Sequence, residues 1–461
     1  MSIYTYSNNW SENQILETAR ELKGKVLKDI DQKGWLVNGG NKGRIGNMIQ
    51  EDFFGIPANS DRAADFKYHG IELKVTPVKR NQKEGFYSKE RLVLGMINYM
   101  KDYEIPFEES LPNKKTRSTL LIFYLHEENQ PVETFKILES VLFKLPAEDL
   151  PQIKEDYQSI INMIVEGRAH ELSEKQQKFL GACTKGQGKG KDWVRQPFSA
   201  EQAKSRAYSY KVGYMSAYFR KLIAPEEVEN ILIPKGQTFI ETVESTLDKY
   251  VGLDIEDIRE MIGYMGSEKD KSYLAKMTHR MFGDNMKSNI NNTEEFLKYG
   301  YAVKIVTNRF KNYKNQDMSF QNLDFTEIQY DSFEDSTWYG LFAETKYILA
   351  IWDEYEEDKY KFSHYLYWIP DDFFISQAKK MYEYIQDMLL KDEIEIYNEG
   401  KTRQETWPDN LPKKGFIEPF QIRPKGTKQS SIISLPNGKL IKKKTFFIDK
   451  KYIRKIVGLE K

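Results

Sequence analysis

The segment from Asp65 to Val75 reads DFKYHGIELKV, and a segment in the other half of the chain, from Glu295 to Ile305, reads EFLKYGYAVKI. Each begins with an acid, passes through aromatic residues and a glycine, and ends in a short apolar run that contains a lysine. A turn followed by alternating apolar and polar residues is typical of a half-buried strand. We therefore predict a strand over 71–78 and a related strand in the second half.

Four more pairs of segments match in the same order in the two halves. They are MIQEDFFG (48–55) with KMTHRMFG (276–283), TLLIFYL (119–125) with KYILAIW (346–352), GACTKG (181–186) with QIRPKG (421–426), and AYSYKVGY (207–214) with TFFIDKKY (445–452). A single match could arise by chance, but five in the same order indicate a duplicated domain. Pro225, Pro234 and Gly236 interrupt the sequence between the halves, so we predict domains at 1–225 and 226–461.

Each half is predicted to be an α+β (mixed α/β) domain, with a central sheet flanked by helices. In the first half, apolar residues at helical spacing predict a helix from Ile45 to Phe53, which Gly55 and Pro57 end. Apolar and β-branched runs predict further strands over 91–97 and 120–125, and a helix is expected over 152–166.

The composition favours a folded, soluble protein. Of the 461 residues 40% are apolar, and 26 Phe, 29 Tyr and 7 Trp can fill the cores. The best uncharged apolar run, Leu120–Leu125, is far shorter than the ~18–20 residues of a membrane span, and the polar first residues are not a secretory signal. The single cysteine, Cys183, excludes an internal disulfide. We expect a cytoplasmic protein with no membrane partner.

The charge is balanced overall, with 69 basic and 69 acidic residues, but it is unevenly distributed. Residues 183–221 hold nine bases against two acids, and residues 411–461 hold fourteen against three. Residues 324–372 are acidic, with thirteen acids against three bases. The basic runs also contain glycines and aromatic residues, which suits contact with a phosphate backbone and exposed bases. This pattern favours nucleic acid as the partner, and a plain solvated surface is the alternative.

Asp65, Glu72 and Lys74 form the main candidate catalytic site. On a strand, Glu72 and Lys74 lie on one face, and a turn at residues 69–70 can return Asp65 to their side. Two carboxylates can then share Mg²⁺, while Lys74 orients or activates a water. Glu51, on the helix before, could supply an accessory carboxylate. Ordinary salt bridges on a strand surface are the alternative interpretation.

The second half has lost these residues. In the match of the two segments, Asp65 becomes Glu295, Glu72 becomes Ala302, and only the lysine persists, as Lys304. In the upstream helix Glu51 becomes His279. We therefore expect a metal site in the first half alone.

These segments resemble the MutH family of DNA endonucleases, and more closely the Sau-type restriction enzymes that cut GATC. The run DFKYHGIELKVTPVKR (65–80) resembles the catalytic segment of that family, and EDFFG (51–55) resembles its helix with an additional acid. The runs SKERLVLGMINY (88–99) and EGRAHELSEKQQKFLGACTKG (166–186) resemble the restriction-enzyme branch. In the second half FQIRPKG (420–426) resembles the base-reading loop of MutH.

The resemblance implies two tandem MutH-like domains and a Mg²⁺-dependent type II restriction endonuclease. The first domain would cut both strands of DNA at GATC, with Asp65 and Glu72 as metal ligands, Lys74 catalytic and Glu51 accessory. The second would bind another DNA copy as an allosteric effector. One active centre per chain implies two chains on the DNA or two sequential nicks. The nearest base to the additional strand lysine of the family is Arg117.

We predict contacts with double-stranded DNA in both halves. Arginine bonds guanine in two places and lysine reaches guanine or phosphate, whereas other cations only position the protein on the backbone. The predicted contacts to bases are Thr184, Lys185, Arg423 and Lys425, and those to phosphates are Arg195, Lys204, Arg206 and Lys211. Two alternatives stay open, a strand-nicking endonuclease of the mismatch-repair type and a non-catalytic DNA-binding regulator.

Overall fold

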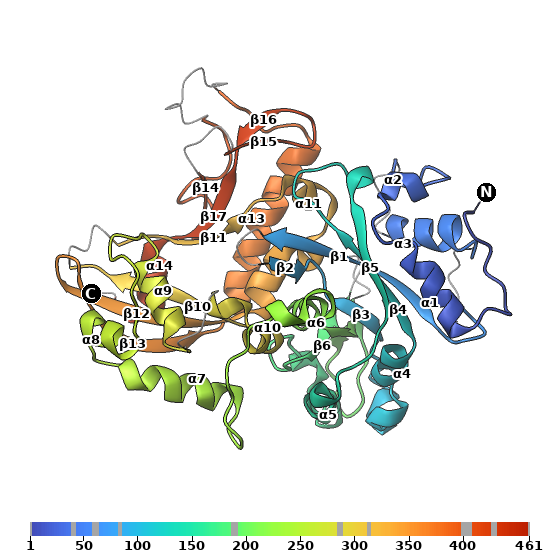
Figure 1. Cartoon of the computed structure of the whole chain (residues 1–461), viewed down its shortest axis with the longest axis horizontal. Coiled ribbons are helices and arrows are strands. Elements are labelled where there is room, and N and C mark those ends of the chain that lie inside the picture. The colour runs from blue at the N-terminus through green and yellow to red at the C-terminus, as the bar shows by residue number, and fades with distance from the viewer. Residues whose placement is uncertain are drawn as a thin grey trace. The chain divides into compact units, whose positions relative to one another are not determined.

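The computed structural model describes residues 2–37, 43–57, 64–81, 85–185, 192–283, 289–310, 315–397, 408–425 and 431–459. The chain divides into two compact units, Met1–Pro225 and Glu226–Lys461, which we call unit 1 and unit 2. Figure 1 labels most of their helices and strands. No helix in the described part of the chain combines the length and the apolar character needed to span a bilayer.

The larger sheet of unit 1 has the strand order β2-β1-β4-β5. Its strands are β1 (Glu72–Asn81), β2 (Gly85–Ser88), β4 (Thr119–Leu125) and β5 (Lys136–Leu142). β1 and β4 are parallel, and the other two pairings are antiparallel. β4 lies inside the sheet, and its sequence TLLIFYL is almost entirely buried because both of its faces are covered.

Helices near the N-terminus cover one face of this sheet. They are α1 (Glu12–Arg20), α2 (Leu27–Ile30) and α3 (Arg44–Met48), and α3 runs on into a π-helical turn, Ile49–Phe53. Figure 1 shows α1 and α3 beside β4 and β5, and their apolar side chains share a core with Leu73 and Ile122. Gly55 ends the helical segment with a φ of +69°, and a Cβ there would lie 2.7 Å from the Tyr4 carbonyl oxygen. Only glycine fits this position.

A second sheet of unit 1 has the antiparallel order β3-β9-β6. Its strands are β3 (Leu92–Met96), β6 (Leu180–Thr184) and β9 (Arg206–Tyr210), and a two-stranded ribbon is formed by β7 (Trp193–Val194) and β8 (Ala203–Lys204). The accompanying helices are α4 (Leu111–Arg117), α5 (Leu150–Val165) and α6 (Val212–Ile223). Buried Asp156 of α5 accepts hydrogen bonds from the N–H groups of residues 178, 179 and 180 at 2.9, 2.6 and 3.0 Å, so α5 fixes the approach to β6.

Unit 2 contains sheets of order β10-β12-β13 and β11-β17-β14 and a ribbon of β15 and β16. The strands are β10 (Tyr301–Asn308), β11 (Met318–Asn322), β12 (Lys346–Glu356), β13 (Lys359–Trp368), β14 (Phe420–Pro424), β15 (Ile432–Ser434), β16 (Leu440–Lys442) and β17 (Lys444–Ile448). The helices are α7 (Phe239–Leu247), α8 (Ile255–Met261), α9 (Tyr273–Arg280), α10 (Glu294–Tyr299), α11 (Phe325–Tyr330), α12 (Thr337–Tyr339), α13 (Asp372–Leu390) and α14 (Lys450–Ile456).

The two units repeat one topology. In each, the first long strand pairs in parallel with a buried strand, which pairs antiparallel with a third. Glu72 pairs with Thr119 and Ala302 pairs with Tyr347, so the sequence match of Thr119 with Lys346 is wrong by one residue. A strand buried on both faces has no polar alternation to fix its register, which explains why the sequence did not reveal the shift.

The mixed α/β class predicted from the sequence is confirmed. The strands predicted over 71–78, 91–97 and 120–125 are β1, β3 and β4, and the helix predicted over 152–166 is α5. The helix predicted over 45–53 is present, with a π-helical second half. Such turns are frequent at functional sites, and this one carries Glu51.

Candidate active site and DNA-facing surfaces

The candidate active site lies where β1 begins. A tight turn before β1, with Gly70 at a φ of +64°, returns Asp65 to the strand, and the Leu73 N–H donates to Asp65 Oδ2 at 2.8 Å. Leu73 is buried in the core, and Glu72 and Lys74 lie on the opposite face of the strand because side chains alternate. The structure brings together the three residues that the sequence singled out.

Glu72 lies between two ammonium groups. Lys74 Nζ is 3.0 Å from Glu72 Oε1, and Lys115 Nζ is 2.6 Å from Glu72 Oε2. Lys115 projects from α4, one helical turn before Thr119, the residue paired with Glu72. The sequence pointed instead to Arg117, which is exposed at the end of α4. The missed signal was a lysine just before the strand that pairs with β1.

The pKa values of the two carboxyl groups are displaced in opposite directions. Burial raises the pKa of Asp65, and the Leu73 N–H only partly opposes this, while the Glu72 charge adds to it. Burial also acts on Glu72, but the hydrogen bonds from Lys115 and Lys74 outweigh it and hold the pKa of Glu72 below its usual value. Neighbouring acids with divergent pKa values are typical of functional sites.

The donor set suits Mg²⁺, which prefers oxygen ligands and keeps several waters. In the described part of the chain Asp65 Oδ1 accepts no hydrogen bond, so this oxygen is available to a cation. Among the described residues no group of three or more His, Cys, Asp and Glu side chains is arranged to hold a metal ion. Asp65 and Glu72 would therefore hold the ion as a pair.

Glu51 is held by a different neighbour. Lys33 Nζ lies 2.6 Å from Glu51 Oε2. The adjacent Asp52 is fully buried and accepts hydrogen bonds from the N–H groups of Gln32 and Lys33 at 2.7 and 3.1 Å. The π-helical turn thus anchors the segment before α3, and the accessory role of Glu51 stays a prediction.

Cations gather at the end of β6 in unit 1. Thr184 closes β6, and the Lys185 N–H donates to the Ser205 carbonyl oxygen at 2.9 Å. Arg195 and Lys204 are exposed on and beside the ribbon of β7 and β8. Lys204 Nζ lies 5.9 Å from the centre of the ring of Trp193, which is 49% exposed. These residues form a basic, partly aromatic surface.

Arg206 and Lys211, which were predicted to contact phosphates, are buried. They are only 7% and 5% exposed. One Arg206 nitrogen donates to the Ala182 carbonyl oxygen at 2.7 Å and to Thr184 Oγ1 at 3.3 Å, and Lys211 Nζ donates to the Gln177 carbonyl oxygen. Because these donors are used inside the unit, the two side chains support β6 and do not belong to the exposed basic surface.

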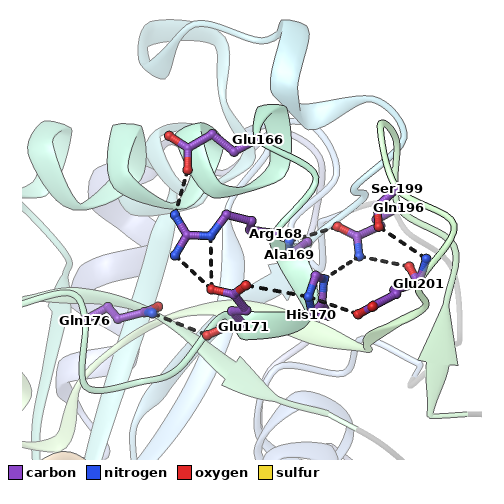
Figure 2. Close-up of polar contacts among 9 residues, drawn as sticks. All are labelled: Glu166, Arg168, Ala169, His170, Glu171, Gln176, Gln196, Ser199 and Glu201. Atoms are coloured by element: carbon purple, nitrogen blue, oxygen red, sulfur yellow. Dashed lines mark hydrogen bonds and ion pairs between the residues drawn. The ribbon is translucent and has the colours of Figure 1, made fainter.

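Gln196 anchors the loop that joins β7 and β8. Figure 2 shows its amide between the backbone at Ala169 and the ring of His170. The Ala169 N–H donates to Gln196 Oε1 at 2.8 Å, so Gln196 Nε2 is the donor toward His170 Nδ1 at 3.0 Å. The His170 proton therefore lies on Nε2, which faces Glu201 Oε2 at 3.0 Å. This network connects the ribbon to the segment after α5.

The corresponding place in unit 2 has lost its acidic pair. The Val303 N–H donates to Asn291 Oδ1 at 2.6 Å, as the Leu73 N–H does to Asp65 in unit 1. Asn291 is therefore the counterpart of Asp65, and the sequence match with Glu295 is wrong. The acceptor precedes the bonded N–H by 12 residues here and by 8 in unit 1, because unit 2 inserts α10 between them.

The other residues of this copy are also altered. Ala302 stands at the position of Glu72, and Lys304 Nζ donates to the Ser319 carbonyl oxygen at 3.2 Å. Glu295 accepts from the Ile231 N–H, and His279 is half-buried, with its pKa lowered to about 4 by loss of solvation. A neutral amide and an alanine cannot replace two carboxylates at a Mg²⁺ site.

Arg423 and Lys425 lie at the end of β14, the counterpart of β6. Arg423 is fixed across the sheet, with its guanidinium carbon 3.8 Å from the centre of the Phe447 ring and a nitrogen 3.2 Å from Asp317 Oδ2. Lys425 is exposed, and its N–H donates to the Lys443 carbonyl oxygen at 2.8 Å. Lys425 is thus accessible from solvent, whereas Arg423 is held in place by its neighbours.

The chain is similar in sequence to known proteins of two kinds. A family model described as the DNA mismatch repair enzyme MutH matches residues 54–156, which include the candidate active site. The chain is 30% identical over 427 residues to the type II restriction enzyme Sau3AI of Staphylococcus aureus, covering 88% of this chain and 84% of that enzyme. It is 27% identical over 236 residues to the DNA mismatch repair protein MutH of Actinobacillus pleuropneumoniae serotype 3, covering 50% of this chain and 98% of that protein.

Proposed function

Since the chain belongs to the family of the restriction enzyme Sau3AI and the mismatch repair protein MutH, we propose that it is a type II restriction endonuclease that cuts both DNA strands at GATC with Mg²⁺. The coarser activity, that of a restriction endonuclease, follows from this relationship along most of its length. The target, the metal and the roles of the units are our proposal.

One observation carries the proposal. The acidic pair and the lysines are assembled in unit 1, whereas unit 2 keeps the same backbone bond with the uncharged Asn291. A purely structural salt-bridge cluster would have no reason to differ in this way, because the amide preserves the hydrogen bond and removes only the charge. Charge is what a cation and a phosphodiester require.

The residues of unit 1 then have distinct tasks. Asp65 and Glu72 would hold Mg²⁺, which supplies charge neutralisation at the phosphate and a more acidic bound water. Lys74 is 36% exposed, so its ammonium can reach a water or a phosphate oxygen. Lys115 holds Glu72 from the other side and keeps it ionised. Hydrolysis adds the water oxygen to phosphorus, and the bond to the leaving oxygen, which takes up a proton, breaks.

The surface at the end of β6 would position the DNA. Lys185 is the candidate for a base contact because it directly follows β6 and is only partly buried. Arg195 and Lys204, which are exposed, are the candidates for phosphate contacts. Thr184 is already bonded through its N–H and its hydroxyl group, so its contribution would be backbone placement. These residues would select the DNA sequence that is hydrolysed at the acidic pair.

Unit 2 would bind a second DNA copy and act as an effector of unit 1. It has the fixed Arg423, the exposed Lys425 and an excess of bases at its C-terminal end, but no acidic pair at the start of β10. A single active centre per chain means that a double-strand break needs two chains on the DNA or two successive nicks.

The test is a plasmid digestion. The protein is incubated with unmethylated supercoiled plasmid and Mg²⁺, and the ends of the products are sequenced to read the target and the cut position. Linear product ending at GATC supports the proposal, and EDTA must abolish it. Intact supercoiled DNA at high protein concentration would overturn it and favour a DNA-binding regulator.

A strand-nicking endonuclease is the second candidate. It is favoured by the match of MutH, which aligns almost completely with only half of this chain. Nicked circles that accumulate without linear product, even at high protein concentration, would support this candidate over double-strand cutting.

A further inference from the structure

A buried ion pair connects two edges of the small sheet in unit 1. Arg91 immediately precedes β3, and one of its terminal nitrogens lies 2.7 Å from Glu174 Oε2. The two side chains are only 8% and 5% exposed. The other oxygen of Glu174 accepts a hydrogen bond from the Thr184 N–H at 3.1 Å. One carboxylate thus connects the arginine before β3 to the last residue of β6.

The guanidinium of Arg91 lies over one face of this sheet. Alternation along the paired strands places five side chains on that face, those of Arg91, Val93, Ser209, Ala207 and Cys183. Burial raises the pKa of the Cys183 thiol. The charge of Arg91 opposes this shift, and the charge of Glu174 adds to it. Because the Thr184 N–H donates to Glu174, the ion pair is bonded to the residue between Cys183 and Lys185.

Unit 2 has an arginine across the same face, but from the opposite strand. Arg423 occupies the place of Cys183, since both pair with corresponding residues of the central strand. Its partner Asp317 immediately precedes β11, as Arg91 precedes β3. The Phe447 ring packs against the Arg423 guanidinium. In unit 1 the corresponding residue is the small Ser209, which leaves room for Arg91 to lie across the sheet.

We propose that Arg91 and Glu174 are positioning residues for base recognition, and that their ion pair replaces in unit 1 the pair that Arg423 and Asp317 form in unit 2. This inference rests on the proposed function, in which the end of β6 reads DNA. A bond from a backbone N–H to a carboxylate is directional and stronger than a bond between neutral groups, and in a buried site it is not weakened by solvent. Such a bond fixes Thr184, and with it the direction in which Lys185 leaves the sheet.

This arrangement accounts for a departure from the family pattern. The reading motif in unit 2 carries its arginine within the loop sequence QIRPKG, whereas unit 1 has GACTKG. In unit 1 the arginine comes from the segment before β3, and the carboxylate from the segment before β6. Unit 1 thus keeps an arginine on this face of the sheet, although its loop sequence contains none.

The experiment compares base discrimination in the full-length protein. Duplexes that contain GATC, and duplexes that differ from them by one base pair, are titrated by fluorescence anisotropy with Ca²⁺ in place of Mg²⁺. The double variant Arg91→Met with Glu174→Leu removes both charges and the bond to Thr184. Replacement of a buried ion pair by apolar residues of similar size is often neutral for stability, so this variant is expected to fold. Glu174→Gln keeps an oxygen acceptor for the Thr184 N–H.

The ratio of the two dissociation constants is the informative quantity, because a loss of folded protein changes both constants equally. We expect the ratio to fall by about tenfold or more in the double variant, comparable to the loss of one base contact, and to fall less in Glu174→Gln. The matched control is Arg168→Met with Glu171→Leu, which removes an exposed 2.8 Å ion pair of the same unit (Figure 2). Its ratio is expected to equal that of the parent protein.

A double variant that discriminates as well as the parent overturns this inference alone. A control variant that loses discrimination to the same extent also overturns it, because the effect would then not be particular to the buried pair. A parent protein that binds all duplexes equally overturns the proposed function, and this inference with it.

Discussion

The substitution Asp65→Asn tests the site by making unit 1 resemble unit 2. In unit 2 the Val303 N–H donates to Asn291 Oδ1 at 2.6 Å, so an asparagine amide can accept the bond that the Leu73 N–H now donates to Asp65. The variant therefore keeps the local fold and removes only the charge. We expect stability and activity to change in opposite directions.

The expected magnitudes follow from the surroundings of Asp65. The retained hydrogen bond is worth about 1 kcal/mol, and burial raises the pKa of Asp65, so ionisation of this group opposes folding. At neutral pH the variant should be as stable as the parent or more stable by up to about 1 kcal/mol. Cleavage should fall by about 10³-fold, which corresponds to about 4 kcal/mol of lost transition-state stabilisation.

The pH dependence has a defined sign. A carboxyl group whose pKa is higher in the folded than in the unfolded protein stabilises the fold at low pH, and this contribution is lost as the pH rises through the folded pKa. The stability difference between the variant and the parent should therefore be smallest in acid and largest at neutral pH. Chemical denaturation at several pH values measures it.

Mg²⁺ provides a second readout. At about ten times its dissociation constant, an ion that binds only the folded state adds about 1.4 kcal/mol to the free energy of unfolding. The parent should gain this increment and Asp65→Asn should not. A variant that still cleaves at the parental rate, or that unfolds more easily by over about 2 kcal/mol, would refute the reasoning, because Asp65 would then be a structural residue.

Four further substitutions concern the cations. Lys115→Met removes the shorter of the two Glu72 ion pairs and should slow single-turnover cleavage by about 10²-fold, whereas unchanged cleavage would remove Lys115 from the site. Arg195→Ala should leave stability unchanged and reduce the slope of log K against log salt concentration by about 0.9, whereas Arg206→Ala should cost about 1.5–3 kcal/mol of stability because its bonds are buried. Arg423→Ala should reduce cleavage of plasmids with several sites and spare plasmids with one site, and equal activity on both would discard the effector role.

Local sequence pattern was sufficient to predict β1, the strand that carries Glu72 and Lys74. The turn at Gly70 and the alternation from Ile71 to Val75 predicted that Glu72 and Lys74 share a face and that Asp65 returns to them, and the structure has this arrangement. These features depend on backbone geometry over a dozen residues, which the amino-acid order specifies directly. The duplication could also be recognised in the sequence, since homologous segments keep their order.

The surroundings of the other site residues depend on packing between segments that are far apart in the sequence. Lys115 reaches Glu72 because α4 leads into the strand that pairs with β1, and Arg206 is buried because β9 is the central strand of its sheet. Asn291 is the counterpart of Asp65, but in the sequence it lies four residues farther from its strand. A match of the two segments without gaps could therefore not align them. A charged side chain looks the same in a sequence whether it faces solvent or a buried carbonyl oxygen, because its surroundings are supplied by residues far away along the chain.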